Sequence, residues 1–162
     1  MRRVGIFIDM QNIYLTTKTL YGKWKINFDK LREFFEKDDT FTTFSVFMCY
    51  DLDNQPQRSF LNALGLLGYR VISKPIRKLP DGLVKANMDL EIAVEIMSQA
   101  DYLDEVILVS GDADFRVLVD FLCRKGKMVT VVGPEKFTST ELILSCHRFV
   151  SFQKIEGIMD ID

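Results

Sequence analysis

The stretch Val4-Gly5-Ile6-Phe7-Ile8-Asp9 is the segment from which the fold can be predicted. Its apolar residues follow one another without polar alternation, which predicts a strand that is buried on both faces. Strands of that kind belong to parallel sheets with helices packed on either side. The stretch therefore predicts an α/β fold, and it places Asp9 at the carboxyl end of the first strand.

The rest of the chain alternates between strand-like and helix-like patterns. Further strands are expected at residues 43–50, 69–76, 106–109, 127–132 and 149–152. Helices are expected at residues 12–20, 28–35, 56–67, 87–100, 115–125 and 139–146, with a turn at 78–82. This alternation predicts one domain over residues 1–162, with a parallel sheet of about five to six strands and helices on both faces. Leu90, Ala93, Val94 and Met97 are the expected buried stripe of the 87–100 helix.

Composition narrows the class of protein. The 162 residues suffice for one full core, the hydrophobic fraction is 48%, and the net charge is −2. No apolar run is long enough to cross a membrane, and Asp9 interrupts the first run too early for a signal peptide. We expect a cytoplasmic protein with no membrane partner. The three cysteines form no CxxC pair and are expected to be free thiols.

Acidic side chains follow two of the predicted strands. Asp9 ends the first strand, Asp112 and Asp114 follow the 106–109 strand, and Asp89 opens the amphipathic segment expected as the 87–100 helix. Ligands of open α/β sheets bind just beyond the carboxyl ends of the strands. Carboxylates gathered there repel one another unless a cation or a proton intervenes, so the pattern indicates a Mg²⁺ or Mn²⁺ site.

Each acid also has a purely structural interpretation. Asp9 or Asn12 could cap the helix that follows the first strand, and Asp114 could cap the helix that begins near Phe115. Asp89 in the first turn of a helix is favoured by the helix dipole alone. The pair Asp112 and Asp114 is harder to explain in this way, because a second uncompensated acid in one turn is costly without a cation.

Basic residues gather ahead of the 87–100 helix. Arg70, Lys74, Arg77 and Lys78 fall within one short segment, and Lys85 follows. We expect the four to contact the phosphates of a nucleic-acid backbone with little sequence preference, and Lys85 to orient a phosphate. A solvated basic surface is the alternative interpretation.

Three motifs together resemble the NYN domain family, including its LabA-like branch, within the PIN-like nuclease superfamily. Phe7-Ile8-Asp9-Met10-Gln11-Asn12 resembles the opening strand and D-x-x-N of that family, Lys85-Ala86-Asn87-Met88-Asp89 its K-G-x-V-D, and Ser110-Gly111-Asp112-Ala113-Asp114-Phe115 its S-G-D-x-D-F. The resemblance implies a Rossmann-like sheet, a divalent metal and ribonuclease activity. It implies Asp9, Asp89, Asp112 and Asp114 as catalytic metal ligands, supported by Asn12, Lys85 and Ser110.

The chain also departs from the family pattern. Glu95 stands where many relatives carry a second helical Asp, and Cys146-His147 stands near a place where an acid is common. The leading functional prediction is a metal-dependent ribonuclease acting on single-stranded RNA. The alternative is a non-catalytic RNA-binding or regulatory module. A phosphatase with an aspartyl nucleophile ranks last, because Gln11 occupies the position of its second Asp. The RNA sequence, the mode of cleavage and the formation of a homodimer stay open.

Overall fold

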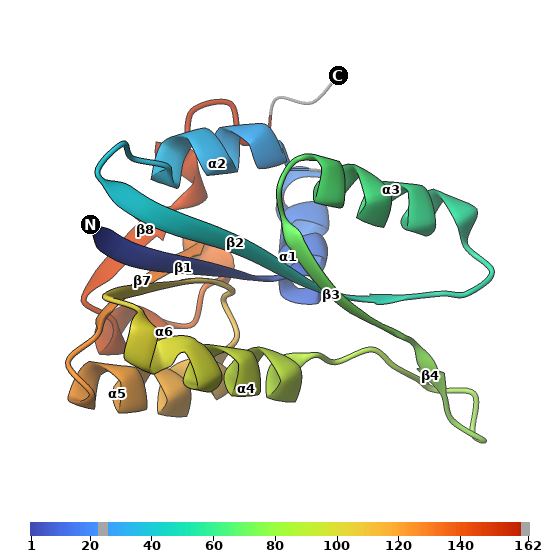
Figure 1. The fold of residues 1–162 in the computed structure, drawn as a ribbon. Helices are drawn as coiled ribbons and strands as arrows, with labels where there is room; N and C mark the ends of the chain where they lie inside the picture. Colours follow the sequence, from blue (N-terminus) through green and yellow to red (C-terminus); the bar gives the residue numbers. More distant parts are fainter. Residues whose placement is uncertain (23–25, 160–162) are drawn as a thin grey trace.

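A six-stranded parallel sheet forms the centre of the molecule (Figure 1). The computed structural model describes residues 1–22 and 26–159, apart from the side chain of Lys85. The sheet has the order β3-β2-β1-β6-β7-β8. Its strands are β1 (Arg2–Asp9), β2 (Thr40–Tyr50), β3 (Arg70–Pro75), β6 (Glu105–Val109), β7 (Met128–Gly133) and β8 (Arg148–Ser151). Every neighbouring pair is parallel, so all six carboxyl ends lie at one edge.

Helices cover both faces of the sheet. One face carries α1 (Met10–Tyr21), α2 (Phe28–Phe35) and α3 (Gln55–Leu66), and the other carries α4 (Asp89–Gln99), α5 (Arg116–Arg124) and α6 (Thr140–Ser145). Each face buries its own apolar cluster. Ile6 and Ile8 of β1 point into the first cluster, while Phe7 between them points into the second. This division explains the uninterrupted apolar run of β1, because successive side chains of a strand face opposite sides and both sides are covered.

The predicted α/β class, the parallel sheet and its helices on both faces are confirmed. Two details differ from the sequence-based prediction. The turn expected at residues 78–82 is the tip of a small antiparallel hairpin, β4 (Arg77–Lys78) and β5 (Val84–Lys85). Short 3₁₀ helices, which the sequence pattern did not show, occupy Ala100–Tyr102, Ala113–Phe115, Glu135–Phe137 and Phe152–Lys154.

The stripe predicted for α4 is wrong. Ile92 and Ile96 are fully buried against the sheet, whereas Leu90, Val94 and Met97 are at least half exposed. Both sets have helical spacing, so the sequence period alone did not distinguish them. The face that meets the sheet is the one with the two isoleucines, and Ala93 is only partly buried beside it.

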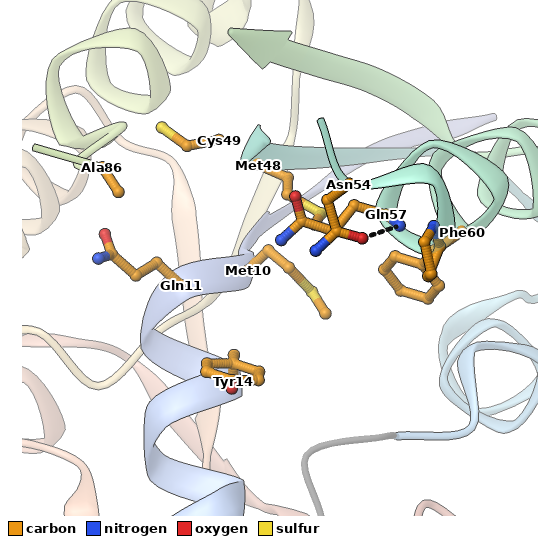
Figure 2. A pocket seen from close by; sticks show the side chains of 10 residues that line it. Met10, Gln11, Tyr14, Met48, Cys49, Asn54, Gln57, Phe60 and Ala86 are labelled. Atoms are coloured by element: carbon orange, nitrogen blue, oxygen red, sulfur yellow. Dashed lines mark hydrogen bonds between the residues drawn. The ribbon is translucent and has the colours of Figure 1, made fainter. Parts of the chain in front are cut away.

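The strand order reverses between β1 and β6, at the middle of the sheet. From β1 the chain proceeds outward to β2 and β3, and it then crosses back to β6 on the other side of β1. The connections at the carboxyl ends of these two strands leave in opposite directions and open a crevice there. A pocket opens at the same edge, between the start of α1 and the start of α3 (Figure 2).

Among the described residues, no helix combines the length and the apolar character that crossing a membrane requires.

Candidate metal centre

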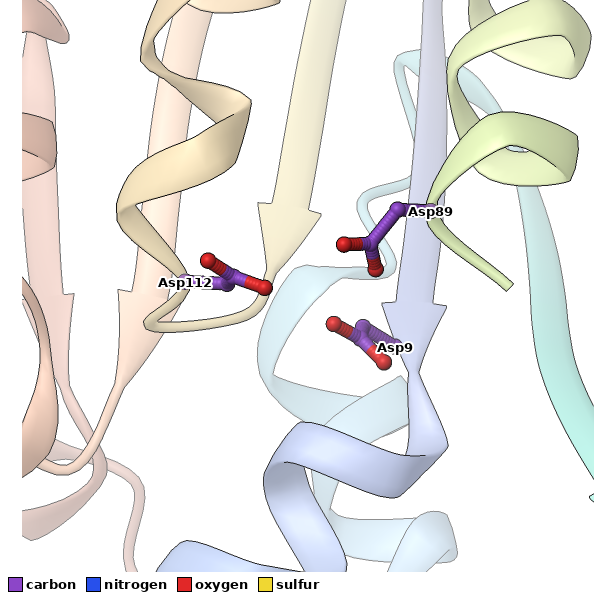
Figure 3. Close-up of side chains that lie close together, drawn as sticks. All are labelled: Asp9, Asp89 and Asp112. Carbon is purple, nitrogen blue, oxygen red and sulfur yellow. The ribbon is translucent and has the colours of Figure 1, made fainter. Parts of the chain in front are cut away.

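Three carboxylates from three separate elements meet at the carboxyl edge of the sheet (Figure 3). Asp9 ends β1, Asp89 begins α4, and Asp112 lies in the loop after β6. Each offers one oxygen, and these oxygens lie within 4.8 Å of one another. The reversal of strand order brings them together, since it places β1 beside β6 and turns both following connections away from the crevice.

Asp9 is the most enclosed of the three, with 4% of its surface exposed. One carboxylate oxygen accepts the backbone N–H of Asn12 at 3.4 Å and thereby caps α1. The other accepts the hydroxyl of Ser110 at 2.9 Å. Burial, with a smaller contribution from the charges of Asp89 and Asp112, raises the pKa of Asp9 to about 6 against the lowering effect of the two hydrogen bonds. Asp9 is therefore both a helix cap and a member of the cluster.

The loop after β6 is held against β1 by side-chain hydrogen bonds. Ser110 is fully buried, and its hydroxyl both donates to Asp9 and accepts the backbone N–H of Asp112 at 3.2 Å. The side-chain carbonyl of Asn12 accepts the backbone N–H of Gly111 at 2.8 Å. These contacts fix the position of Asp112 relative to Asp9.

Gly111 is required by the close approach of another part of its own chain. A Cβ atom at this position would lie 2.6 Å from the carbonyl oxygen of Phe137 and 3.0 Å from the Cα of Thr138. Its carbonyl also accepts the backbone N–H of Ser139 at 3.0 Å. Any larger residue would displace this loop, and with it Asp112.

Asp89 is placed by a residue that the sequence analysis did not single out. The side chain of Asn87 accepts the backbone N–H of Asp89 at 2.7 Å and donates to its carboxylate at 3.2 Å. Partial burial raises the pKa of Asp89, and the charges of Asp112 and Asp114 add to that effect. An Asn two residues ahead of an acid at the start of a helix is the signal that could have identified Asn87.

Asp114 is the fourth predicted acid, and it lies outside the group of three. Its side chain is exposed, on the 3₁₀ helix Ala113–Phe115. Its backbone N–H donates to Asp112 at 2.9 Å, so Asp112, rather than Asp114, caps this helix. Asp114 still contributes to the raised pKa of Asp89, which places it at the rim of the cluster.

The four basic residues divide into two pairs. Arg70 and Lys74 lie on the same face of β3, and they form ion pairs with Glu95 and Glu91 of α4. Arg77 and Lys78 of β4 are exposed and form no ion pair with any other residue that the structure describes. The hairpin therefore carries the uncompensated part of the positive charge.

The remaining predicted positions either lie away from the three carboxylates or have side chains that the structure does not describe. The side chain of Lys85 lies outside the described part of the chain. Glu95 binds Arg70 and the side chain of Gln99, so it does not serve as a further acid of the cluster. His147 lies at the amino edge of the sheet, where its Nδ1 accepts the backbone N–H of Val129 at 3.0 Å.

The fold and the cluster define a class: a Rossmann-like α/β domain with an acidic centre at its topological switch point. The NYN domain matches residues 3–156. The chain thus belongs to the NYN domain family, as the three sequence motifs predicted.

Two relatives cover nearly the whole chain. The low amplitude and bright protein LabA of Synechococcus elongatus is 27% identical, over 98% of this chain and 88% of its own length. A crystal structure of a protein of unknown function from Vibrio parahaemolyticus superimposes with a TM-score of 0.85, at 29% identity and over 93% of each chain. The family and the acidic cluster are consistent with a ribonuclease type of function.

Proposed function

We propose that this protein is a metal-dependent ribonuclease that hydrolyses phosphodiester bonds of single-stranded RNA. The observation that carries the proposal is the convergence of Asp9, Asp89 and Asp112 from three separate elements. None of the three takes part in an ion pair between described residues. Like charges collected without a counter-ion are unfavourable, and a bound cation would relieve that cost.

The donor set suits a hard divalent ion. Mg²⁺ prefers oxygen ligands at 2.0–2.1 Å, so oxygens on opposite sides of it are about 4.2 Å apart. The oxygens here lie within 4.8 Å of one another, close enough for one such ion to be held by all three carboxylates. When bound, such an ion lowers the pKa of a water molecule toward neutrality and stabilises the charge that develops on the phosphate.

The residues around the cluster hold it in place before the substrate arrives. Asp9, Asp89 and Asp112 would hold the ion. Ser110 joins Asp9 to the Asp112 loop, Asn12 holds Gly111, and so the carboxylates need little reorganisation. Pre-arranged groups of this kind are the main source of electrostatic catalysis. Asp114 is exposed at the rim of the cluster, so it would act on a bound substrate from the solvent-exposed side of the site.

The RNA backbone would be attracted by the hairpin. Arg77 and Lys78 are exposed, while Arg70 and Lys74 are already compensated by glutamates. We assign the main phosphate contacts to Arg77 and Lys78, with Lys85 as the cation nearest in sequence to Asp89. Arg70 and Lys74 would contribute only after exchanging their partners on α4.

The decisive experiment compares wild type with Asp112→Asn on end-labelled single-stranded RNA, with Mn²⁺ or Mg²⁺ and with EDTA. Asparagine keeps an oxygen that can accept the N–H of Asp114, so the local turn should survive. We expect cleavage by the wild type that EDTA abolishes, and a loss on the order of 10³-fold in rate for the variant, by analogy with removal of a preorganised electrostatic group.

The matched control is Asp39→Asn, an exposed acid in the turn before β2 at the opposite edge of the sheet. It should cleave like the wild type. All proteins are purified identically, because contaminating ribonuclease would then appear in every sample. Equal cleavage by wild type and Asp112→Asn, or none across a panel of RNAs and metals, would support the non-catalytic RNA-binding module instead.

A further inference from the structure

A pocket of about 330 Å³ opens at the same edge of the sheet as the three carboxylates. It opens between α1 and α3 beyond the end of β2 (Figure 2). Met10, which follows Asp9 in the chain, forms part of its wall, and so does Ala86, three residues before Asp89. Its volume is at the lower end of the range for small-molecule sites, roughly 300–1,000 Å³. The pocket therefore has room for one small group of a ligand whose other end lies at the three carboxylates.

The lining is neutral, since none of its ten residues is acidic or basic. None of these ten side chains would supply a phosphate with a counter-charge. The rings of Tyr14 and Phe60 offer flat apolar surfaces, and the amides of Gln11, Asn54 and Gln57 offer donors and acceptors. Flat apolar surface combined with directional polar groups is the chemistry that recognises an unstacked nucleobase.

The amide groups are only partly engaged. The side-chain carbonyl of Asn54 accepts the backbone N–H of Gln57 at 3.1 Å, and the carbonyl of Gln57 accepts that of Asp51 at 2.7 Å. Among the described residues, neither amide nitrogen has a hydrogen-bond partner, and the exposed side chain of Gln11 has none either. The amide N–H groups of Asn54 and Gln57, and both the N–H and the carbonyl of the Gln11 amide, are thus available to hydrogen-bond a ligand.

We propose that this pocket binds the nucleobase of the nucleotide whose phosphate lies at the three carboxylates, with adenine preferred. The assignment rests on the proposed ribonuclease function, which places a phosphate there. Glutamine and asparagine amides pair with adenine through two hydrogen bonds, whereas guanine is typically bound by Arg or Lys and cytosine by Asp or Glu. Of these base-reading side chains, the lining contains only the amides.

The first test follows the methionine methyl groups by NMR, in EDTA, so that its result does not depend on cleavage. Met10 and Met48 line the pocket, while Met97 and Met128 are exposed elsewhere and serve as internal controls. The probes are adenosine, guanosine, cytidine, uridine and ribose 5-phosphate, each titrated separately. We expect adenosine to shift Met10 and Met48 at the lowest concentration and ribose 5-phosphate to shift neither.

Two variants test the amides. Gln57→Glu keeps the oxygen that binds Asp51 but loses the N–H donor, and Gln11→Ala removes a side chain that has no described hydrogen bond. Each should weaken adenosine binding about threefold to tenfold, the range for one hydrogen bond. Gln55→Ala is the matched control, since Gln55 is exposed on the same helix as Gln57 and does not line the pocket. It should bind like the wild type.

The second test measures kcat/KM on oligonucleotides that differ in a single base. The wild type should prefer adenine at one position beside the cleaved bond, and Gln57→Glu and Gln11→Ala should flatten that preference. Cleavage without any nucleoside-induced shift at Met10 and Met48, or shifts equal to those from ribose 5-phosphate, would overturn the base pocket and leave the ribonuclease intact. Adenosine binding without cleavage would overturn the ribonuclease and leave the pocket. Tighter binding of another nucleoside would overturn the adenine preference.

Discussion

Asp9 is a carboxylate that the fold shields from water and surrounds with like charge. Its two hydrogen bonds offset part of this cost, but the balance still raises its pKa to about 6. An acid whose pKa is higher in the folded state than in the unfolded one binds its proton more tightly when folded. The stability linked to that proton is present below pH 4, and it is lost as the pH rises through about 6.

This linkage predicts how Asp9→Asn changes the metal-free protein. Relative to wild type, the variant should gain stability as the pH rises from about 4 to about 7.5, by up to about 3 kcal/mol for the full shift. The measurement is denaturant unfolding of both proteins in EDTA across that range. Asp101→Asn is the control, because an exposed ion pair with Lys125 lowers the pKa of Asp101, so its difference from wild type should stay constant over this range and change only at lower pH. A constant difference between Asp9→Asn and wild type would contradict the raised pKa.

The hairpin β4–β5 is the element on which a basic surface remains uncompensated. Two of the basic residues that the sequence grouped together are bound to α4, so the electrostatic attraction of the group depends on the other two, Arg77 and Lys78. Residues that touch phosphates supply affinity without base preference, and their effect weakens with salt.

Replacing both Arg77 and Lys78 with Ala should weaken binding to all single-stranded RNAs by a similar factor. The slope of log K against log salt should fall by about 1.4, corresponding to two lost phosphate contacts. Fluorescence anisotropy in EDTA over a salt series measures both quantities without cleavage. The control removes Arg124, the last residue of α5, and Lys127, in the turn that leads to β7 at the amino edge of the sheet. An unchanged slope in the hairpin variant would mean that these side chains are ordinary solvated surface.

At the scale of the whole molecule, the acidic centre joins parts of the chain that are distant in sequence. A ligand that binds only the folded state stabilises it by mass action, by about 2.7 kcal/mol at a hundredfold excess over Kd. For a domain of this size, that corresponds to a rise in Tm of roughly 5–10 °C.

We therefore expect Mn²⁺ or Mg²⁺ to raise the Tm of wild type. Asp112→Asn should melt at a higher temperature than wild type in EDTA, because one of three like charges is removed. It should also gain less from the metal. Differential scanning fluorimetry with and without metal provides the comparison, with Asp39→Asn as the control that responds like wild type. If Asp112→Asn and wild type gain equally, the carboxylates are not the ligands.

The sequence by itself determined the alternation of strands and helices, the parallel sheet and the chain order of the three acidic motifs. These are properties of local pattern: an apolar run without alternation requires cover on both faces, whatever else the chain does. The same pattern placed Asp9 and Asp112 at strand ends, from which their proximity follows once the strands are parallel neighbours.

Some pairs of residues have the same local sequence pattern but different roles in the protein. Only the tertiary structure decided which role each residue has. Leu90 and Ile92 both lie on helical stripes, and the packing of α4 on the sheet buried the isoleucine. Asp112 and Asp114 are separated by one residue, and the loop that packs at Gly111 against Phe137 and Thr138 brings only Asp112 to Asp9. Arg70 and Arg77 have the same charge, and Glu95 on α4 neutralised one of them. In each case the deciding contact comes from an element distant in the chain, and local sequence pattern does not contain it.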